Sequence, residues 1–166
     1  EEMETRHDIE ISGLKIGGIV DRKDHITLDG LPCLRIVDYK TGTFSSDKIS
    51  ASDLSELTTC QPKSKAYLLQ TFLYSLVCLE QQQASADGSR EHIVPALYFL
   101  QRTSDPNYRP YVKLGRSEML NFADVAPDFK AELTSLIERM QSSPFTPTDL
   151  PDKCALCPYR LLCGET

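Results

Sequence analysis

The fold of this chain is decided by a run that passes from apolar to charged residues and then into a turn, Val37-Asp38-Tyr39-Lys40-Thr41-Gly42. Successive side chains of a strand point to opposite faces, so Asp38 and Lys40 share one face while Val37 and Tyr39 share the other. Thr41-Gly42 ends the strand. We therefore expect a carboxylate and an ammonium side by side at a sheet rim that a ligand can reach.

A second carboxylate, Asp21, lies in the preceding run, Gly17-Gly18-Ile19-Val20-Asp21-Arg22-Lys23-Asp24, which also turns from apolar to charged at its end. Two antiparallel strands joined by a turn at Asp29-Gly30 would bring Asp21 beside Asp38. Mg²⁺ and Mn²⁺ take oxygen ligands, and they commonly use one or two carboxylates together with waters and a substrate phosphate oxygen. A neighbouring lysine such as Lys40 can orient a water or neutralise charge on phosphorus oxygens.

The order and spacing of three motifs carry a family resemblance. GxxDRxD from Gly18 to Asp24 is followed by IVDYKTG from Ile36 to Gly42, and then by Gln70 and Tyr74 as QxxxY. This pattern resembles the RecB-like exonuclease branch of the PD-(D/E)XK nuclease superfamily. The resemblance implies an α/β (α+β) fold with a restriction-endonuclease-like core, in which helices flank a central mixed β-sheet.

The same resemblance implies a role for each motif residue. Asp21 and Asp38 would bind the metal, with the backbone carbonyl of Tyr39 as a further ligand, and Lys40 would be the catalytic lysine. Gln70 and Tyr74 lie four positions apart, which places them on one face of a helix. From the residues alone, a carboxylate and a lysine two positions apart are more often a solvated rim, Gln70 is a surface residue and Tyr74 a core aromatic.

The flanking sequence predicts the remaining elements. We expect a hairpin turn at Ser12-Gly13, a polar loop over residues 43–62, a helix over 63–83 and a strand over 92–100 in which Pro95 marks a start or an edge. A further strand is expected over 108–114. The last helix is expected over 128–141, with core residues Phe129, Leu133, Leu136, Ile137 and Met140.

Three cysteines in ten residues form a second motif over 154–163: Cys154, Cys157 and Cys163. Thiolates so spaced are ligands for zinc or an iron–sulfur cluster, and in a reducing cytoplasm a metal is favoured over a disulfide. The motif resembles the C-terminal nuclease domain of AddB-type helicase-nucleases, which implies a [4Fe–4S] cluster completed by an upstream cysteine. No cysteine precedes Cys33, and Cys33 and Cys78 are expected to be buried thiols.

The family's first motif, a histidine or glutamate on an upstream helix, has no place before the first strand, and none of the early acidic residues or His7 can be assigned to it. We therefore expect residues 1–166 to be a single nuclease domain and a fragment of a longer chain. No apolar run reaches the length of a membrane span and no leader pattern opens the sequence, which predicts a cytoplasmic protein without a membrane partner.

The formal net charge of −6 argues against a free-standing DNA-binding protein. Tethering to a DNA-tracking helicase region or subunit would supply the substrate by proximity. Basic residues that could form a local phosphate path are Arg22, Lys23, Lys40, Lys48, Lys63 and Lys65.

These observations predict a Mg²⁺- or Mn²⁺-dependent DNA exonuclease domain of a helicase-nuclease, acting on single- or double-stranded linear ends in repair and recombination. Two alternatives stay open. One is a module that keeps the nuclease fold but has lost hydrolysis, and the other is an interaction domain stapled by zinc at the three cysteines.

Overall fold

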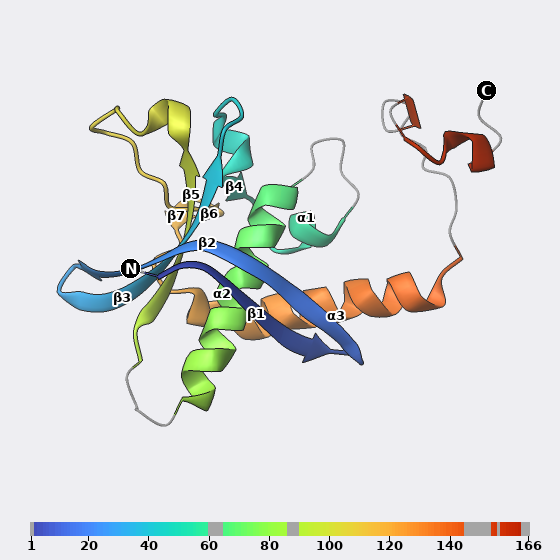
Figure 1. Ribbon diagram of the computed structural model, residues 1–166, viewed down its shortest axis with the longest axis horizontal. Helices are drawn as coiled ribbons and strands as arrows, with labels where there is room; N and C mark the ends of the chain where they lie inside the picture. The colour runs from blue at the N-terminus through green and yellow to red at the C-terminus, as the bar shows by residue number, and fades with distance from the viewer. Residues whose placement is uncertain (1, 60–64, 86–89, 145–153, 156, 164–166) are drawn as a thin grey trace.

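The computed structural model describes residues 2–59, 65–85, 90–144, 154–155 and 157–163, with the side chains described from residue 8 onward (Figure 1). Its main sheet has the strand order β1 (Glu2–Ile11), β2 (Leu14–Leu28), β3 (Leu31–Lys40) and β5 (His92–Phe99). β1, β2 and β3 are antiparallel to their neighbours, whereas β3 and β5 are parallel. The mixed sheet that the sequence predicts is therefore present.

Two tight hairpins connect the first three strands, at the predicted positions. Ser12 and Gly13 have φ of 48° and 74°, and Asp29 and Gly30 have φ of 51° and 80°. Two consecutive residues with positive φ are typical of the type I′ turn, whose twist matches that of the adjoining strands.

β2 is longer than its sequence suggests. The predicted change to charged residues near Asp24 does not end the strand, which continues to Leu28. The reason is cross-strand pairing: Asp24 lies opposite Arg35 of β3, and Arg35 Nη2 lies 2.6 Å from Asp24 Oδ2. Charges that neutralise each other across the ladder are tolerated inside a strand.

α2 (Ala66–Ala84) forms the crossover between the parallel strands β3 and β5 and packs against the main sheet. The segment before it is predicted to be a plain loop, which is wrong for its described part. It contains the 3₁₀ turn η1 (Ser46–Lys48), the short strand β4 (Ser50–Ala51) and the helical turn α1 (Ser55–Thr58). β4 pairs with β6 (Lys113–Leu114), and β6 pairs with β7 (Ser117–Glu118).

β5 closes one edge of the main sheet, which explains how it accommodates Pro95. Leu97 N donates to Pro110 O at 2.8 Å, on the side of β5 away from β3. Pro95 lies two residues earlier, so its nitrogen faces the same side and no hydrogen bond to β3 is lost. The predicted strand over 108–114 is reduced to a single bridge between Tyr111 and Ala96 and to β6.

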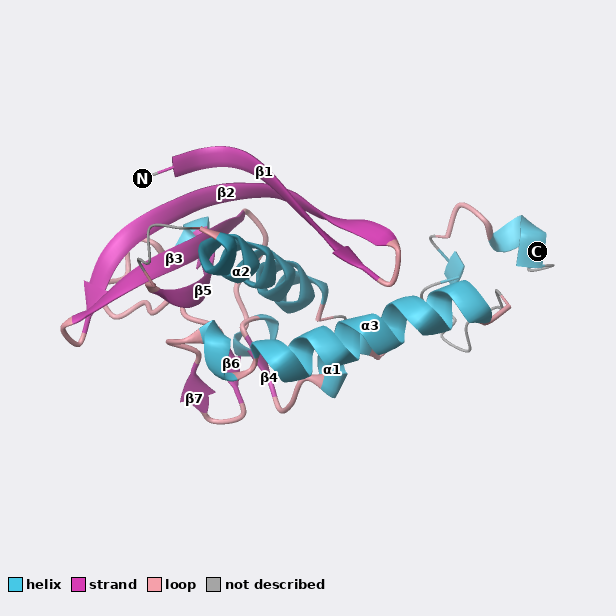
Figure 2. Cartoon of the chain, turned by 90° about the horizontal axis from the view of Figure 1, so that it is seen from below, coloured by secondary structure: helices cyan, strands magenta, loops and turns pink. Residues whose placement is uncertain are grey.

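The main core lies between the sheet, α2 and α3 (Ala126–Ser142), and Figure 2 shows the sheet curving over α2 with α3 beyond it. Phe72 of α2, Phe129 of α3 and Phe122 of the 3₁₀ turn η3 (Phe122–Asp124) meet edge to face, with ring centroids 5.4–5.8 Å apart. The prediction that Met140 belongs to this core is wrong, because α3 extends past the core and Met140 is 61% exposed.

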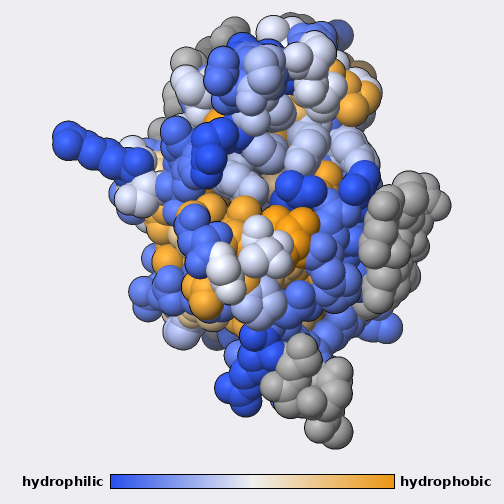
Figure 3. Space-filling view, turned by 90° about the vertical axis from the view of Figure 1, so that its left-hand side faces the viewer, coloured by the Kyte–Doolittle hydropathy of each residue, from blue (hydrophilic) through white to orange (hydrophobic). Residues whose placement is uncertain are grey.

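The surface of the protein mixes hydrophilic and apolar residues. Figure 3 shows apolar residues gathered in the middle of one face with hydrophilic residues around them. Along the part of the chain that the structure describes, no helix is both long and apolar enough to cross a membrane.

Candidate functional site

The two predicted carboxylates meet where β2 and β3 part. Arg22 of β2 lies opposite Val37 of β3, so the next step of the register places Asp21 opposite Asp38. The Asp21 carboxylate also binds the β3 backbone directly, because Tyr39 N donates to Asp21 Oδ2 at 2.9 Å. The structure therefore brings Asp21 and Asp38 together, as the hairpin predicts.

The sequence predicts that Asp38 lies at an open rim of the sheet, but the structure buries it, with an exposed fraction of 2%. Burial raises the pKa of its carboxyl group; the nearby Asp21 adds to this shift, and Lys40 opposes it. The Lys40 ammonium forms an ion pair with the buried Asp38 Oδ2, for which no other partner is found among the described residues.

Lys40 is held by the helix that follows. Its Nζ donates to Gln70 Oε1 at 3.0 Å, and Gln70 Nε2 donates to the Tyr74 hydroxyl at 3.0 Å. Lysine can only donate hydrogen bonds, so the orientation of the Gln70 amide is fixed and the Tyr74 hydroxyl proton stays available for a further acceptor. The structure thus places all five predicted side chains, Asp21, Asp38, Lys40, Gln70 and Tyr74, in one connected group.

Gly18 is a site residue whose role the sequence does not reveal. A Cβ atom at this position would lie 2.9 Å from Tyr74 Cε1 and 3.1 Å from the Tyr74 hydroxyl oxygen. Gly18, which opens the GxxDRxD motif on β2, therefore sets how closely Tyr74 of α2 approaches the sheet. The signal available in the sequence is a glycine inside a strand, which often marks a close approach of two groups.

Tyr67 is a second residue that the sequence analysis missed. Lys40 Nζ lies 4.4 Å from the centre of the Tyr67 ring, within the range of a cation–π interaction. Tyr67 precedes Gln70 by three positions and Tyr74 by seven, so one face of α2 carries all three residues. That spacing, read together with the QxxxY motif, is the signal that could have identified it.

The opposite face of β2 and β3 carries a separate charged cluster of Arg22, Asp24 and Arg35. Burial raises the pKa of the Asp24 carboxyl group, but hydrogen bonds from Arg22 and Arg35 outweigh it and lower the pKa overall. Arg22 also donates to the Tyr39 hydroxyl at 3.3 Å. Arg22 is therefore turned away from Asp21 and Asp38, which argues against its predicted place in a phosphate path; Lys63 lies outside the described residues.

The donor set fits a hard divalent cation. Asp21 and Asp38 supply carboxylate oxygens, and the buried Asp38 Oδ2 has the Lys40 ammonium as its one partner among the described residues. Among the described residues, no group of three or more His, Cys, Asp or Glu side chains is placed to hold a metal ion. A site with two carboxylates suits Mg²⁺ or Mn²⁺, whose remaining ligands are commonly waters and substrate phosphate oxygens.

The cysteine motif stands apart from this group. Residues 154–155 and 157–163 lie beyond the end of α3, away from the main sheet in both ribbon views (Figures 1 and 2). Cys33 and Cys78 are buried, with exposed fractions of 2% and 3%, as predicted. The described residues do not assemble the four thiolates that a [4Fe–4S] cluster requires. Cys60 lies outside the described residues.

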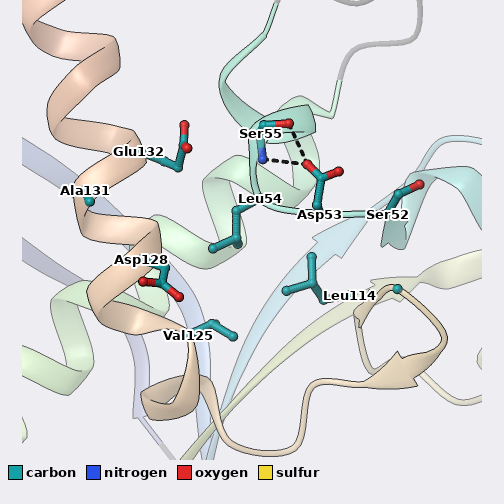
Figure 4. A pocket seen from close by; sticks show the side chains of 10 residues that line it. Ser52, Asp53, Leu54, Ser55, Leu114, Val125, Asp128, Ala131 and Glu132 are labelled. Atoms are coloured by element: carbon teal, nitrogen blue, oxygen red, sulfur yellow. Dashed lines mark hydrogen bonds between the residues drawn. The ribbon is translucent and has the colours of Figure 1, made fainter.

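A cavity of about 690 Å³ lies elsewhere, between the β4–α1 segment, β6 and α3 (Figure 4). Two of the acidic side chains that line it, Asp53 and Glu132, have local partners. Asp53 accepts hydrogen bonds from Ser55 N at 2.9 Å and Ser55 Oγ at 2.6 Å, and Glu132 accepts one from Thr58 Oγ1 at 3.2 Å. None of the predicted site residues lines this cavity, so it plays no part in positioning them.

Comparison with protein families matches residues 1–164 to the model described as the PD-(D/E)XK nuclease superfamily. Comparisons with curated proteins and with solved structures found no match. The family match covers every element that builds the carboxylate site.

Proposed function

Since the chain belongs to the PD-(D/E)XK nuclease superfamily, whose members are typically phosphodiester-cleaving nucleases, we propose that Asp21, Asp38 and Lys40 form the active site of a Mg²⁺- or Mn²⁺-dependent deoxyribonuclease. The observation that carries this proposal is the buried Asp38 carboxylate, which lies beside Asp21 and forms an ion pair with Lys40. A buried carboxylate with a raised pKa next to a second carboxylate is costly for the fold, and such groups concentrate at functional sites.

When bound at Asp21 and Asp38, Mg²⁺ or Mn²⁺ would polarise the phosphoryl group and lower the pKa of a bound water. Lys40 would donate its ammonium hydrogens to the attacking water or to the phosphate oxygens, where negative charge develops. Gln70 holds Lys40 Nζ in place from the side of α2. The Tyr74 hydroxyl, which already accepts from Gln70, has its proton free to donate to a substrate oxygen.

We further propose that this site belongs to the RecB-like branch and acts as an exonuclease on linear DNA ends. Support comes from the contacts between the motifs, because Gly18 touches Tyr74 and Lys40 binds Gln70. A helicase partner and a role in repair and recombination complete the proposal. The net charge of −6 favours a partner that delivers the DNA.

The cysteine motif is proposed as a metal-binding segment, with zinc and an iron–sulfur cluster as the two alternatives. Cys33 and Cys78 are buried in the sheet and in α2, so neither can supply a fourth ligand without disrupting the core. Three closely spaced cysteines used as metal ligands suit a reducing compartment such as the cytoplasm. Metal analysis with visible absorbance separates iron and sulfide from stoichiometric zinc.

The test of the nuclease proposal is cleavage of end-labelled linear single- and double-stranded DNA, and of closed circular DNA, with Mg²⁺, Mn²⁺ or EDTA. Lys40→Ala should lower the metal-dependent rate at least a hundredfold, as is typical when a group that stabilises the transition state is removed. Lys130→Ala is the matched control, because Lys130 lies on α3 and its ammonium pairs with Glu80. Cleavage of closed circles would contradict the exonuclease assignment, and binding without cleavage would support the non-hydrolysing module.

A further inference from the structure

An exposed aromatic ring stands beside the proposed catalytic lysine. Tyr67 is 37% exposed, whereas Lys40, whose Nζ lies 4.4 Å from the Tyr67 ring centre, has a side-chain exposure of 13%. We propose that Tyr67 stacks on a base next to the cleaved phosphate and gives the site a preference for unpaired, single-stranded DNA. This inference rests on the proposed nuclease function and adds the form of its substrate.

The Tyr67 ring packs against other aromatic side chains. It lies 6.3 Å from the ring of Phe99, which is fully buried, and Phe44 meets Phe99 edge to face at 5.4 Å. Contacts of this kind fix the position of a ring at little further entropic cost. Tyr67 is therefore a rigid side chain with exposed surface, which is what a stacking platform requires.

Two further lysines belong to this region: Lys48 lies near Phe99, and Lys65 precedes Tyr67 by two positions. Lys48 Nζ lies 6.0 Å from the centre of the Phe99 ring and donates to the backbone carbonyl of Thr43 at 2.5 Å. Lys65 Nζ donates to the backbone carbonyls of Asp47 and Ser50, each at 2.8 Å, and lies 3.7 Å from one Glu56 oxygen. Lys40 and Lys48 thus place ammonium groups beside aromatic rings, a combination that suits a single strand because its phosphates and bases are both accessible.

Stacking also answers the difficulty raised by the net charge. A chain with a formal charge of −6 gains little affinity by neutralising phosphates. Stacking on an aromatic ring adds affinity without added charge, and it tolerates any sequence because every base has a π-face. Inside a duplex both faces of a base are already stacked, so away from the ends of the DNA Tyr67 gains this contact only with an unpaired nucleotide.

The competing role for Tyr67 is to hold Lys40 through the cation–π contact alone. That role predicts a lower rate of cleavage on every substrate and no dependence on the bases of the DNA. The stacking role predicts weaker binding of single strands in particular, and a dependence on one base near the cleaved bond.

The test is the binding of a fluorescent single-stranded oligonucleotide and its duplex, measured by anisotropy in EDTA so that no cleavage occurs. Tyr67→Leu should bind the single strand roughly ten- to a hundredfold more weakly and the duplex within threefold of wild type. Tyr67→Phe, which keeps the ring, should stay within threefold on both. Leu31→Ala removes another exposed apolar side chain, 49% exposed at the start of β3 and outside the site, and should match wild type.

Oligonucleotides with one abasic position near the end identify the stacked base. Wild type should lose affinity when the stacked base is removed, and Tyr67→Leu should show no further loss on the same oligonucleotide. Equal weakening of single strand and duplex, an abasic effect of the same size in both proteins, or no measurable binding of single strands by wild type would overturn the inference. Because these measurements need no hydrolysis, a protein that stacks single strands but does not cleave would overturn only the nuclease proposal.

Discussion

Replacing Gly18 by alanine tests whether the strand motif that begins at Gly18 and the helix motif of Gln70 and Tyr74 depend on each other. The new Cβ would lie 2.9 Å from Tyr74 Cε1, whereas carbon atoms pack best at about 3.5–4.0 Å, so the ring must retreat by roughly 0.6–1.1 Å. Tyr74 is buried, with an exposed fraction of 8%, so this movement disturbs the core. Overpacking of this kind costs about 1–3 kcal/mol, and the lower entropy of the unfolded alanine chain offsets about 0.4–1 kcal/mol.

We therefore expect Gly18→Ala to lower the free energy of unfolding by about 1–2 kcal/mol, which corresponds to a fall in Tm of roughly 2–8 °C for a chain of this length. The retreat of Tyr74 also draws its hydroxyl from Gln70, which holds Lys40. A shift of about 1 Å in a positioning group can cost up to a hundredfold in rate, so the cleavage rate should fall by ten- to a hundredfold.

Urea unfolding and the cleavage assay measure the two effects. Gly42→Ala is the matched control, because a Cβ atom at exposed Gly42 meets nothing within 4 Å. In a Tyr74→Ala background the ring is gone, and Gly18→Ala should then cost less by at least about 1 kcal/mol. The reasoning is refuted if Gly18→Ala is as stable as wild type, or if its cost is unchanged when the Tyr74 ring is absent.

Two further predictions concern the carboxylates. Because the pKa of Asp38 is raised in the folded protein, its charged form destabilises the fold at neutral pH; Asp38→Asn should therefore stabilise the metal-free protein by about 1 kcal/mol at pH 7. Urea unfolding should show this gain shrinking as the pH falls through the raised pKa and vanishing below the ordinary carboxyl pKa of about 3.9, where both states are protonated. Mg²⁺ or Mn²⁺ at a hundred times its Kd should stabilise wild type by about 2.7 kcal/mol, a rise in Tm of roughly 5–10 °C in a thermal melt. Asp21→Asn should lose most of that rise, and an equal rise in the variant would exclude Asp21 as a ligand.

Much of the fold could be predicted because its signals are local. The alternation in β3, the turns at Ser12-Gly13 and Asp29-Gly30 and the apolar spacing of α2 each depend on neighbours in sequence. The length of β2 could not be read in this way, because Asp24 stays in the strand only through its pairing with Arg35 of β3.

The candidate site likewise has a part that local sequence signals predict and a part that they do not. Asp38 and Lys40 lie on one face because of the two-residue period of a strand. The position of Asp21 follows from the register of the hairpin. Three other features depend on where α2 crosses the sheet. They are the burial of Asp38, the close approach of Gly18 and Tyr74, and the cation–π contact between Lys40 and Tyr67. A helix periodicity predicts which side chains share a face, but it does not fix where the helix docks.

Asp21 and Asp38 both lie on the β2–β3 hairpin, and this has a consequence for how the protein folds. β2 and β3 meet through contacts of short sequence separation, whereas β3 and β5 must wait for the α2 crossover to close a long loop. Asp21 and Asp38 therefore come close together as soon as the hairpin forms, before α2 brings Gln70 to hold the Lys40 ammonium. A divalent cation present during folding would reduce the repulsion between the two carboxylates and speed the formation of the hairpin. The metal that serves the mature site would then also assist the folding of the protein.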